Sequence, residues 1–217
     1  MSEPAIGAAA HTRTWWAPGA RAWWVGVLFM IGSACFALGS VPAYLDAVGS
    51  AADGVTYFVG SIFFTSAAFL QMREGWDVSK VDRWAGGVQF VGTIFFNFST
   101  AHALVTNLSA AEADRTVWRP DALGSICFLV ASELAVYALG KGWVPWYPRV
   151  RSWWIATLNM VGSIAFGISA VASYVIHDSG LMRNAGRANL GTLIGALCFL
   201  VGALLLLPER TRPSPAL

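Results

Sequence analysis

Six apolar segments, each about long enough to cross a lipid bilayer, constrain this chain more than any other feature of its sequence. They cover residues 23–45, 54–72, 85–105, 121–140, 153–176 and 189–207. A helix needs about 20 apolar residues to cross the hydrocarbon core, and backbone outside helices has to stay out of lipid. Short polar connections separate the segments. We therefore expect an all-α, polytopic membrane bundle of six transmembrane helices without a separate soluble domain.

The amino-acid composition agrees with lipid as the main solvent of this chain. Hydrophobic residues make up 56% of the sequence and charged residues 12%, with a mean hydropathy of +0.57. Soluble domains carry about 25% charged residues because their surface faces water. The net charge of +2 is small and the basic residues are dispersed, which argues against nucleic acid as a partner. The expected partner is the lipid bilayer, whereas a substrate or a protein partner leaves no readable pattern.

The basic residues predict the orientation of the helices. One side holds both termini and the second and fourth connections, and its basic residues are Arg13, Arg21, Arg73, Lys80, Arg83, Lys141, Arg149, Arg151, Arg210 and Arg212. The opposite side has only Arg115, Arg119, Arg183 and Arg187. Cytoplasmic connections are enriched in Lys and Arg. We therefore expect a multi-pass protein of a bacterial cytoplasmic membrane with both termini in the cytoplasm.

A short pattern recurs once in every apolar segment. A glycine is followed four residues later by a phenylalanine and seven residues later by a small residue. The glycines, called the pattern glycines below, are Gly32, Gly60, Gly92, Gly124, Gly162 and Gly195. The phenylalanines are Phe36, Phe64, Phe96, Phe128, Phe166 and Phe199. Small residues seven apart fall on one helix face and allow close helix contact in lipid, so these twelve residues are predicted to pack the helices together.

A second feature distinguishes alternate segments. In the first, third and fifth segments a tryptophan precedes the pattern glycine by eight residues, at Trp24, Trp84 and Trp154. The repeating unit is therefore predicted to be a two-helix hairpin. Three hairpins would cover residues 23–80, 81–148 and 149–207, with an interfacial segment at 1–22 and a cytoplasmic tail at 208–217. Parallel repeats are related by an axis along the membrane normal, which predicts a pseudo-threefold bundle.

Paired helices that each carry Gly-Ser-x-x-Phe, as Gly32–Phe36 with Gly60–Phe64, resemble the YrhK-like family of small bacterial membrane proteins. Members of that family are short hairpin modules without an established activity. The resemblance implies three tandem modules over most of this chain. It implies no catalytic residue and no cofactor.

Polar residues inside the segments are the candidates for function, because they are costly in lipid. Glu133 is the clearest, with Gln89 and Thr93 as expected partners at a similar depth. A polar stripe along the third segment and one residue on the fifth complete the set: Gln89, Thr93, Asn97, Thr100, Asn107 and Asn159. Two interpretations stay open. These groups form structural hydrogen bonds between helices, or they line a polar path for transport or proton relay.

The sequence ranks three functions without deciding between them. Motifs for hydrolysis, phosphate binding, zinc and redox chemistry are absent from the sequence, so we expect no enzyme, cofactor or metal. The first interpretation is a non-enzymatic membrane protein that acts as an accessory or interaction component. The second is a small transporter or channel that uses Glu133 and the polar stripe. The third is a membrane redox protein with haem held between His102 and His177, since bundle cores build such sites from facing side chains.

Overall fold

A computed structural model describes residues 15–75, 78–140, 146–176 and 178–210 of the chain. The described part is helical and contains no β-strand. Its elements are α1 (Arg21–Gly39), α2 (Pro42–Gly75), α3 (Lys80–His102), α4 (Ala110–Ala113), the π-helix η1 (Asp114–Trp118), α5 (Arg119–Gly140), α6 (Arg151–Ala172) and α7 (Ala185–Arg210). The short α4 and η1 continue directly into α5, so the long helices are α1, α2, α3, α5, α6 and α7.

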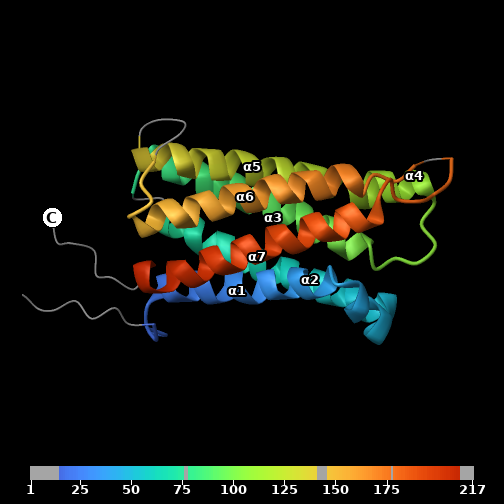
Figure 1. Cartoon of the computed structure of the whole chain (residues 1–217), viewed down its shortest axis with the longest axis horizontal. Helices are drawn as coiled ribbons and strands as arrows, with labels where there is room; N and C mark the ends of the chain where they lie inside the picture. The colour runs from blue at the N-terminus through green and yellow to red at the C-terminus, as the bar shows by residue number, and fades with distance from the viewer. Residues whose placement is uncertain (1–14, 76–77, 141–145, 177, 211–217) are drawn as a thin grey trace, which may run out of the picture.

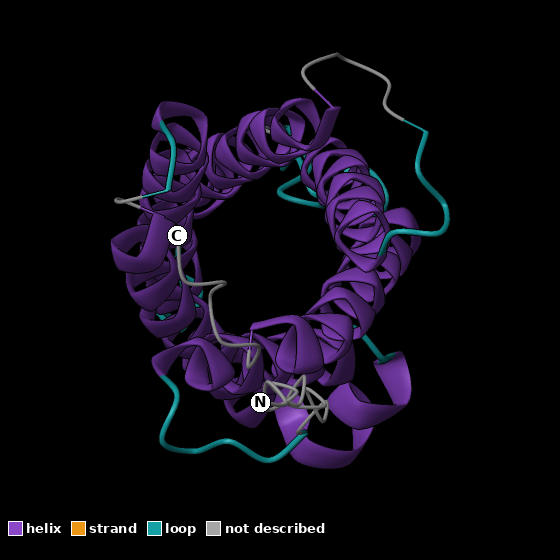
Figure 2. Ribbon diagram, turned by 90° about the vertical axis from the view of Figure 1, so that its left-hand side faces the viewer, coloured by secondary structure: helices purple, strands orange, loops and turns teal. Residues whose placement is uncertain are grey.

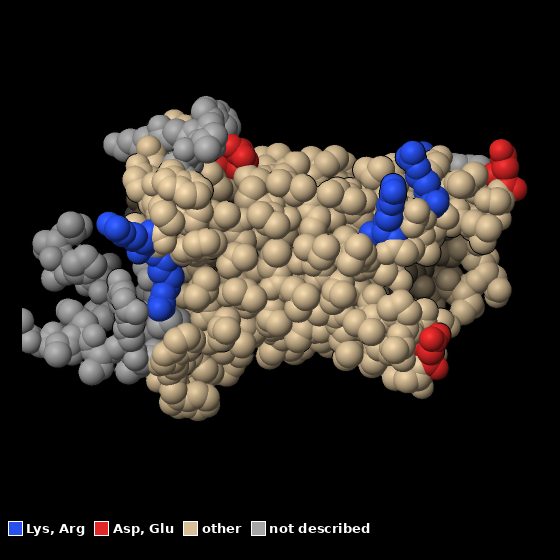
Figure 3. Space-filling view, in the orientation of Figure 1, with Lys and Arg blue, Asp and Glu red and all other residues tan. Residues whose placement is uncertain are grey.

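Within the described residues, five helices are long and apolar enough to cross a membrane. They are Arg21–Gly39, Pro42–Gly75, Ala110–Gly140, Arg151–Ala172 and Ala185–Leu207. The sixth long helix, α3, has 23 residues but is not among them. Its polar stripe lowers its hydropathy. Figure 3 shows that Lys and Arg side chains lie near the two ends of the visible face, whereas its middle is uncharged.

The first two helices differ in their bounds from the apolar segments that the sequence suggests. α1 ends at Gly39, and α2 begins at Pro42, well before residue 54. Proline suits the first position of a helix because its missing N–H has no partner there in any case. α2 is then interrupted at Gly49, whose φ of 80° and ψ of 162° are not helical. The first predicted segment, 23–45, is therefore too long, because residues 42–48 form a short extra helix that includes its last residues and the start of the predicted connection.

The six long helices form a ring in the order of the chain. α2 packs on α1 and α3, α5 packs on α3 and α6, and α7 packs on α6 and closes the ring on α1. Figure 2 shows the helices around a common axis, and Figure 1 shows that they run nearly parallel to the long axis of the molecule. Helices α1, α3 and α6 begin at one end of the ring, where α7 also ends. We call this the terminal end.

Pattern glycines of adjacent helices face each other. A Cβ atom added at Gly32 would lie 2.9 Å from the carbonyl oxygen of Gly60, and one added at Gly92 would lie 3.2 Å from that of Gly124. At Gly162 the corresponding distance to the carbonyl oxygen of Gly195 is 3.1 Å. Larger side chains would separate these backbones, so the glycines allow the close contact of α1 with α2, α3 with α5, and α6 with α7.

The six phenylalanines of the pattern meet on the axis of the ring. The rings of Phe36, Phe96 and Phe166 form one triangle with centroid distances of 6.1–6.4 Å. The rings of Phe64, Phe128 and Phe199 form a second, with distances of 5.5–6.1 Å. The two triangles contact each other through pairs 5.1–5.5 Å apart. All six side chains are buried, and together they form what we call the phenylalanine plug.

Candidate functional site

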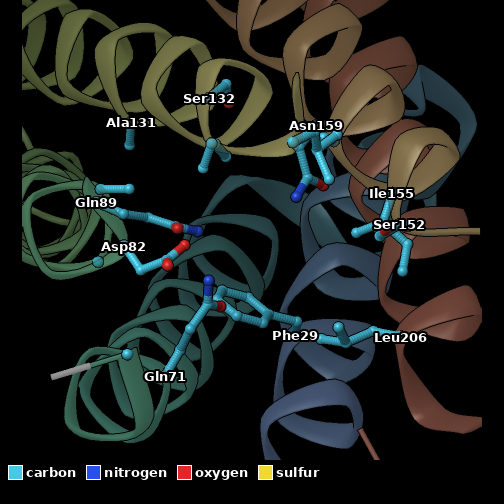
Figure 4. A pocket seen from close by; sticks show the side chains of 18 of the residues that line it. Phe29, Gln71, Asp82, Gln89, Ala131, Ser132, Ser152, Ile155, Asn159 and Leu206 are labelled. Atoms are coloured by element: carbon cyan, nitrogen blue, oxygen red, sulfur yellow. The ribbon is translucent and has the colours of Figure 1, made fainter. Parts of the chain in front are cut away.

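A cavity of about 450 Å³ lies inside the ring between the phenylalanine plug and the terminal end. All six long helices contribute to its wall, and the plug residue Phe199 limits its depth. We call this cavity the vestibule. Its polar lining residues are Gln71, Asp82, Gln89, Ser132, Ser152 and Asn159. In Figure 4, Gln71, Asp82 and Gln89 point toward one another from α2 and α3, and Asn159 approaches from the opposite side.

Helix geometry explains why the vestibule has its polar groups where it does. Helices α1, α3 and α6 each direct into it the residue three positions before their pattern glycine, namely Phe29, Gln89 and Asn159. Residues three apart lie on the same helix face, one turn from each other. Each of the three also lies seven residues, or about two turns, before the plug phenylalanine of its own helix. The helix face that carries the phenylalanine therefore continues into the vestibule. Two of the three equivalent positions are amides, and the third, on α1, is a phenyl ring.

Among the described residues, the lining of the vestibule has one acidic and several neutral polar side chains but no Lys or Arg. The acidic residue is Asp82. Its carboxylate accepts a hydrogen bond of 2.6 Å from the Ser79 hydroxyl, while its backbone N–H donates to the same hydroxyl oxygen at 3.1 Å and caps α3. Amides and hydroxyls can replace the water around a small polar solute, and a carboxylate favours positive charge. The vestibule therefore suits a cation or a neutral polar solute.

The residues of the predicted polar stripe of α3 lie in different surroundings. Gln89 reaches the vestibule. Thr93 is fully buried and donates to the carbonyl oxygen of Phe90 in its own helix at 2.7 Å. Thr100 bonds to the hydroxyl of Ser61 on α2 at 2.9 Å.

The other two residues of the stripe lie apart from the vestibule. The buried Oδ1 of Asn97 has no hydrogen-bond partner among the described residues. Asn107 lies beyond the end of α3, with a φ of 68°. The stripe thus combines contact between helices with a single vestibule residue.

Glu133 lies on the outside of the ring. Its helix α5 lines the vestibule with Ala131, Ser132 and Ala135, and Glu133 does not contribute. At about 100° per residue, Glu133 is two residues from both Ala131 and Ala135 and points about 160° away from each of them. The side chain is half-buried. The structure records no hydrogen bond between Glu133 and the partners that we expected for it, Gln89 and Thr93.

The structure describes one of the two histidines that the haem hypothesis requires. His102 makes a contact of 2.8 Å between Nδ1 and the carbonyl oxygen of Phe98, and it stacks on the exposed ring of that residue. His177 lies outside the described residues. No group of three His, Cys, Asp or Glu side chains within the described ranges could hold a metal ion. Haem binding stays a prediction of the sequence alone.

The sequence did not indicate that several other residues line the vestibule. Gln71 lies eleven residues after its pattern glycine, and Ala135 and Leu206 occupy the same position in the other two helices that run toward the terminal end. All three line the vestibule. Counting positions from the pattern glycines would therefore have found Gln71, whereas Asp82 looks like an ordinary helix-capping residue.

Comparison of the chain with protein-family models, with curated proteins and with solved structures found no match. The resemblance to the YrhK-like family rests on the Gly-Ser-x-x-Phe motifs alone.

Proposed function

We propose that the protein is a non-enzymatic membrane transporter or channel for a small cation or neutral polar solute. The observation that carries the proposal is the vestibule of about 450 Å³, which holds six polar side chains on an otherwise apolar wall and ends on the phenylalanine plug. Hydrophobic constrictions close pores by excluding water. In this proposal the vestibule binds the solute, the plug is the closed gate, and transport requires the six rings to move apart.

The proposal also includes the arrangement of the helices in the membrane. Six transmembrane helices, as three tandem hairpins with pseudo-threefold symmetry, surround the solute path, and both termini lie in the cytoplasm of a bacterium. The facing pattern glycines and the two triangles of phenylalanines support the symmetry. The position of α3 between α2 and α5 supports its role as the sixth membrane helix. The vestibule would then open toward the cytoplasm. Membership of the YrhK-like family belongs to the same proposal.

The gate can be tested in liposomes that contain the purified protein. We expect the double variant Phe128→Ala/Phe199→Ala to release trapped K⁺ or guanidinium faster than the wild-type chain, because two rings of the plug are gone. Phe98→Ala is the matched control, since Phe98 is 55% exposed and lies outside the plug. A folded double variant that is as tight as protein-free liposomes to both cations and to glycerol would refute the proposed gate.

The vestibule can be tested separately from the gate. In the double variant background, Gln89→Leu and Asn159→Leu should slow the flux, because leucine fills a similar volume without offering an amide. Asp82→Asn distinguishes the solute classes. It should slow cations and leave glycerol unchanged if charge at the vestibule matters. Flux that is insensitive to all three changes would contradict binding in the vestibule.

A second candidate function is favoured by the position of Glu133. A carboxyl group on the lipid-facing side of a membrane helix is costly unless another group covers it. A partner helix with a hydrogen-bond donor would do so, and the protein would then be an accessory subunit. Photo-crosslinking from position 133 in native membranes should capture that partner, and crosslinking from Ile126, on the same face of α5, is the comparison. Exclusive crosslinking to lipid would rule this candidate out.

A further inference from the structure

A second cavity of about 470 Å³ lies on the outer surface of the ring, away from the axis. Its apolar wall includes Leu129 on α5 and Ile164, Ile168 and Val171 on α6. Each of these four side chains is at least 40% exposed, so the cavity is an open groove that faces outward. On a membrane helix this surface faces lipid chains.

Gly167 creates the depth of the groove. It lies on α6 among the apolar lining residues, and a Cβ atom added there would meet nothing within 4 Å. The glycine is therefore not needed for a close helix contact, unlike the pattern glycine Gly162 of the same helix. A larger side chain at residue 167 would fill the groove without disturbing the packing of the ring.

Two arginines stand at one end of the groove. Arg183 and Arg187 line it and are exposed. The structure shows no salt bridge for either arginine, so neither has a carboxylate partner among the described residues. Figure 3 shows basic side chains on this part of the molecule, near the end of α6 and the start of α7, beside the uncharged middle.

The start of α7 adds positive potential at the same place. The side-chain oxygen of Asn184, which also lines the groove, accepts a hydrogen bond of 2.9 Å from the backbone N–H of Arg187. This contact caps the first turn of α7. The N-terminal end of a helix carries partial positive charge, which attracts anions.

We infer that the groove binds an anionic phospholipid. Its phosphate contacts Arg183 and Arg187, and one acyl chain lies along Ile164, Ile168 and Val171. Guanidinium groups match phosphate oxygens in charge and geometry. The eight residues from Ile164 to Val171 extend about 10 Å along the helix, from the polar end toward the middle of the membrane. The site lies outside the ring and does not depend on the proposed transport function.

Native mass spectrometry of the full-length protein tests this inference with phosphatidylglycerol and phosphatidylcholine of identical acyl chains. The wild-type protein should retain phosphatidylglycerol preferentially. Arg183→Gln/Arg187→Gln should reduce that preference at least about tenfold, because two charge-assisted contacts are lost. Arg115→Gln is the control, as an exposed arginine outside the groove. Gly167→Leu should reduce the retention of both lipids.

Three outcomes would overturn the inference. The first is equal retention of the two lipids by the wild-type protein. The second is an equal effect of Arg115→Gln and of the double arginine variant, which would indicate general surface charge. The third is displacement of phosphatidylglycerol by millimolar inorganic phosphate together with full binding by Gly167→Leu, which would indicate a site for free phosphate. Size-exclusion profiles identical to the wild-type profile establish that each variant is folded.

Discussion

Ser163 on α6 and Ser132 on α5 share a hydrogen bond of 2.8 Å that joins two adjacent helices. Ser163 directly follows its pattern glycine, and Ser132 lies eight residues after its own. The equivalent pair where α7 closes the ring on α1 is Ser33 and Ala203. Ser33 is fully buried, and its hydroxyl has no partner among the described residues. Because residue 203 of α7 is an alanine and has no hydroxyl, the contact between α1 and α7 lacks the equivalent hydrogen bond.

Ala203→Ser should supply the missing partner and stabilise the protein. Hydrogen bonds between membrane helices contribute about 0.6 kcal/mol on average, so we expect a gain of about that size in SDS-induced unfolding. Ser33→Ala in the same background should remove the gain. Equal stability of Ala203→Ser and the wild-type protein, with Ser33→Ala neutral in both, would show that the two hydroxyls do not meet.

Gly92→Ala should destabilise the contact between α3 and α5. The new Cβ atom would lie 2.8 Å from that of Cys127 and 2.9 Å from a ring carbon of Phe128. Overpacking of this kind costs about 1–3 kcal/mol, measured by SDS-induced unfolding. Gly87→Ala on the same helix is the control, because nothing lies within 4 Å of the added atom. The prediction fails if both variants unfold at the same SDS concentration.

Arg119→Gln should destabilise the segment that leads into α5. The Arg119 side chain pairs with the carboxylate of Asp114 at 2.9 Å, and the Asp114 side chain is only 6% exposed. Removal of one partner leaves a buried charge uncompensated, at a cost of about 1–3 kcal/mol. Thermal unfolding in detergent measures the loss. Asp114→Asn/Arg119→Gln should recover most of it, and a double variant as unstable as the single one would contradict the mechanism.

Glu133→Gln should leave solute flux through the plug variant unchanged. Glu133 points away from the vestibule, so neutralising it alters neither the lining nor its charge. Flux assays in liposomes that compare it with Gln89→Leu measure the difference. A loss of flux in Glu133→Gln equal to that in Gln89→Leu would contradict this prediction. It would support the interpretation from the sequence in which Glu133 takes part in transport.

The sequence by itself determined the helical class and most of the long helices, because lipid permits few alternatives to a helix of about 20 apolar residues. The recurring glycine and phenylalanine positions also identified residues that lie at close helix contacts and on the axis. These features depend on local pattern and length. They can be recognised in a sequence because the same residue types recur at a fixed spacing.

Only the tertiary structure decided which polar residues meet and where they point. Ser132 and Glu133 are neighbours in the chain, yet the 100° step of the helix directs one to the vestibule and the other to the outside of the ring. The same holds for Ser61 and Thr100, which are 39 residues apart and hydrogen-bonded. The sequence gives each helix a periodic surface, but the orientation of that surface follows from the neighbours that the closed ring places on either side.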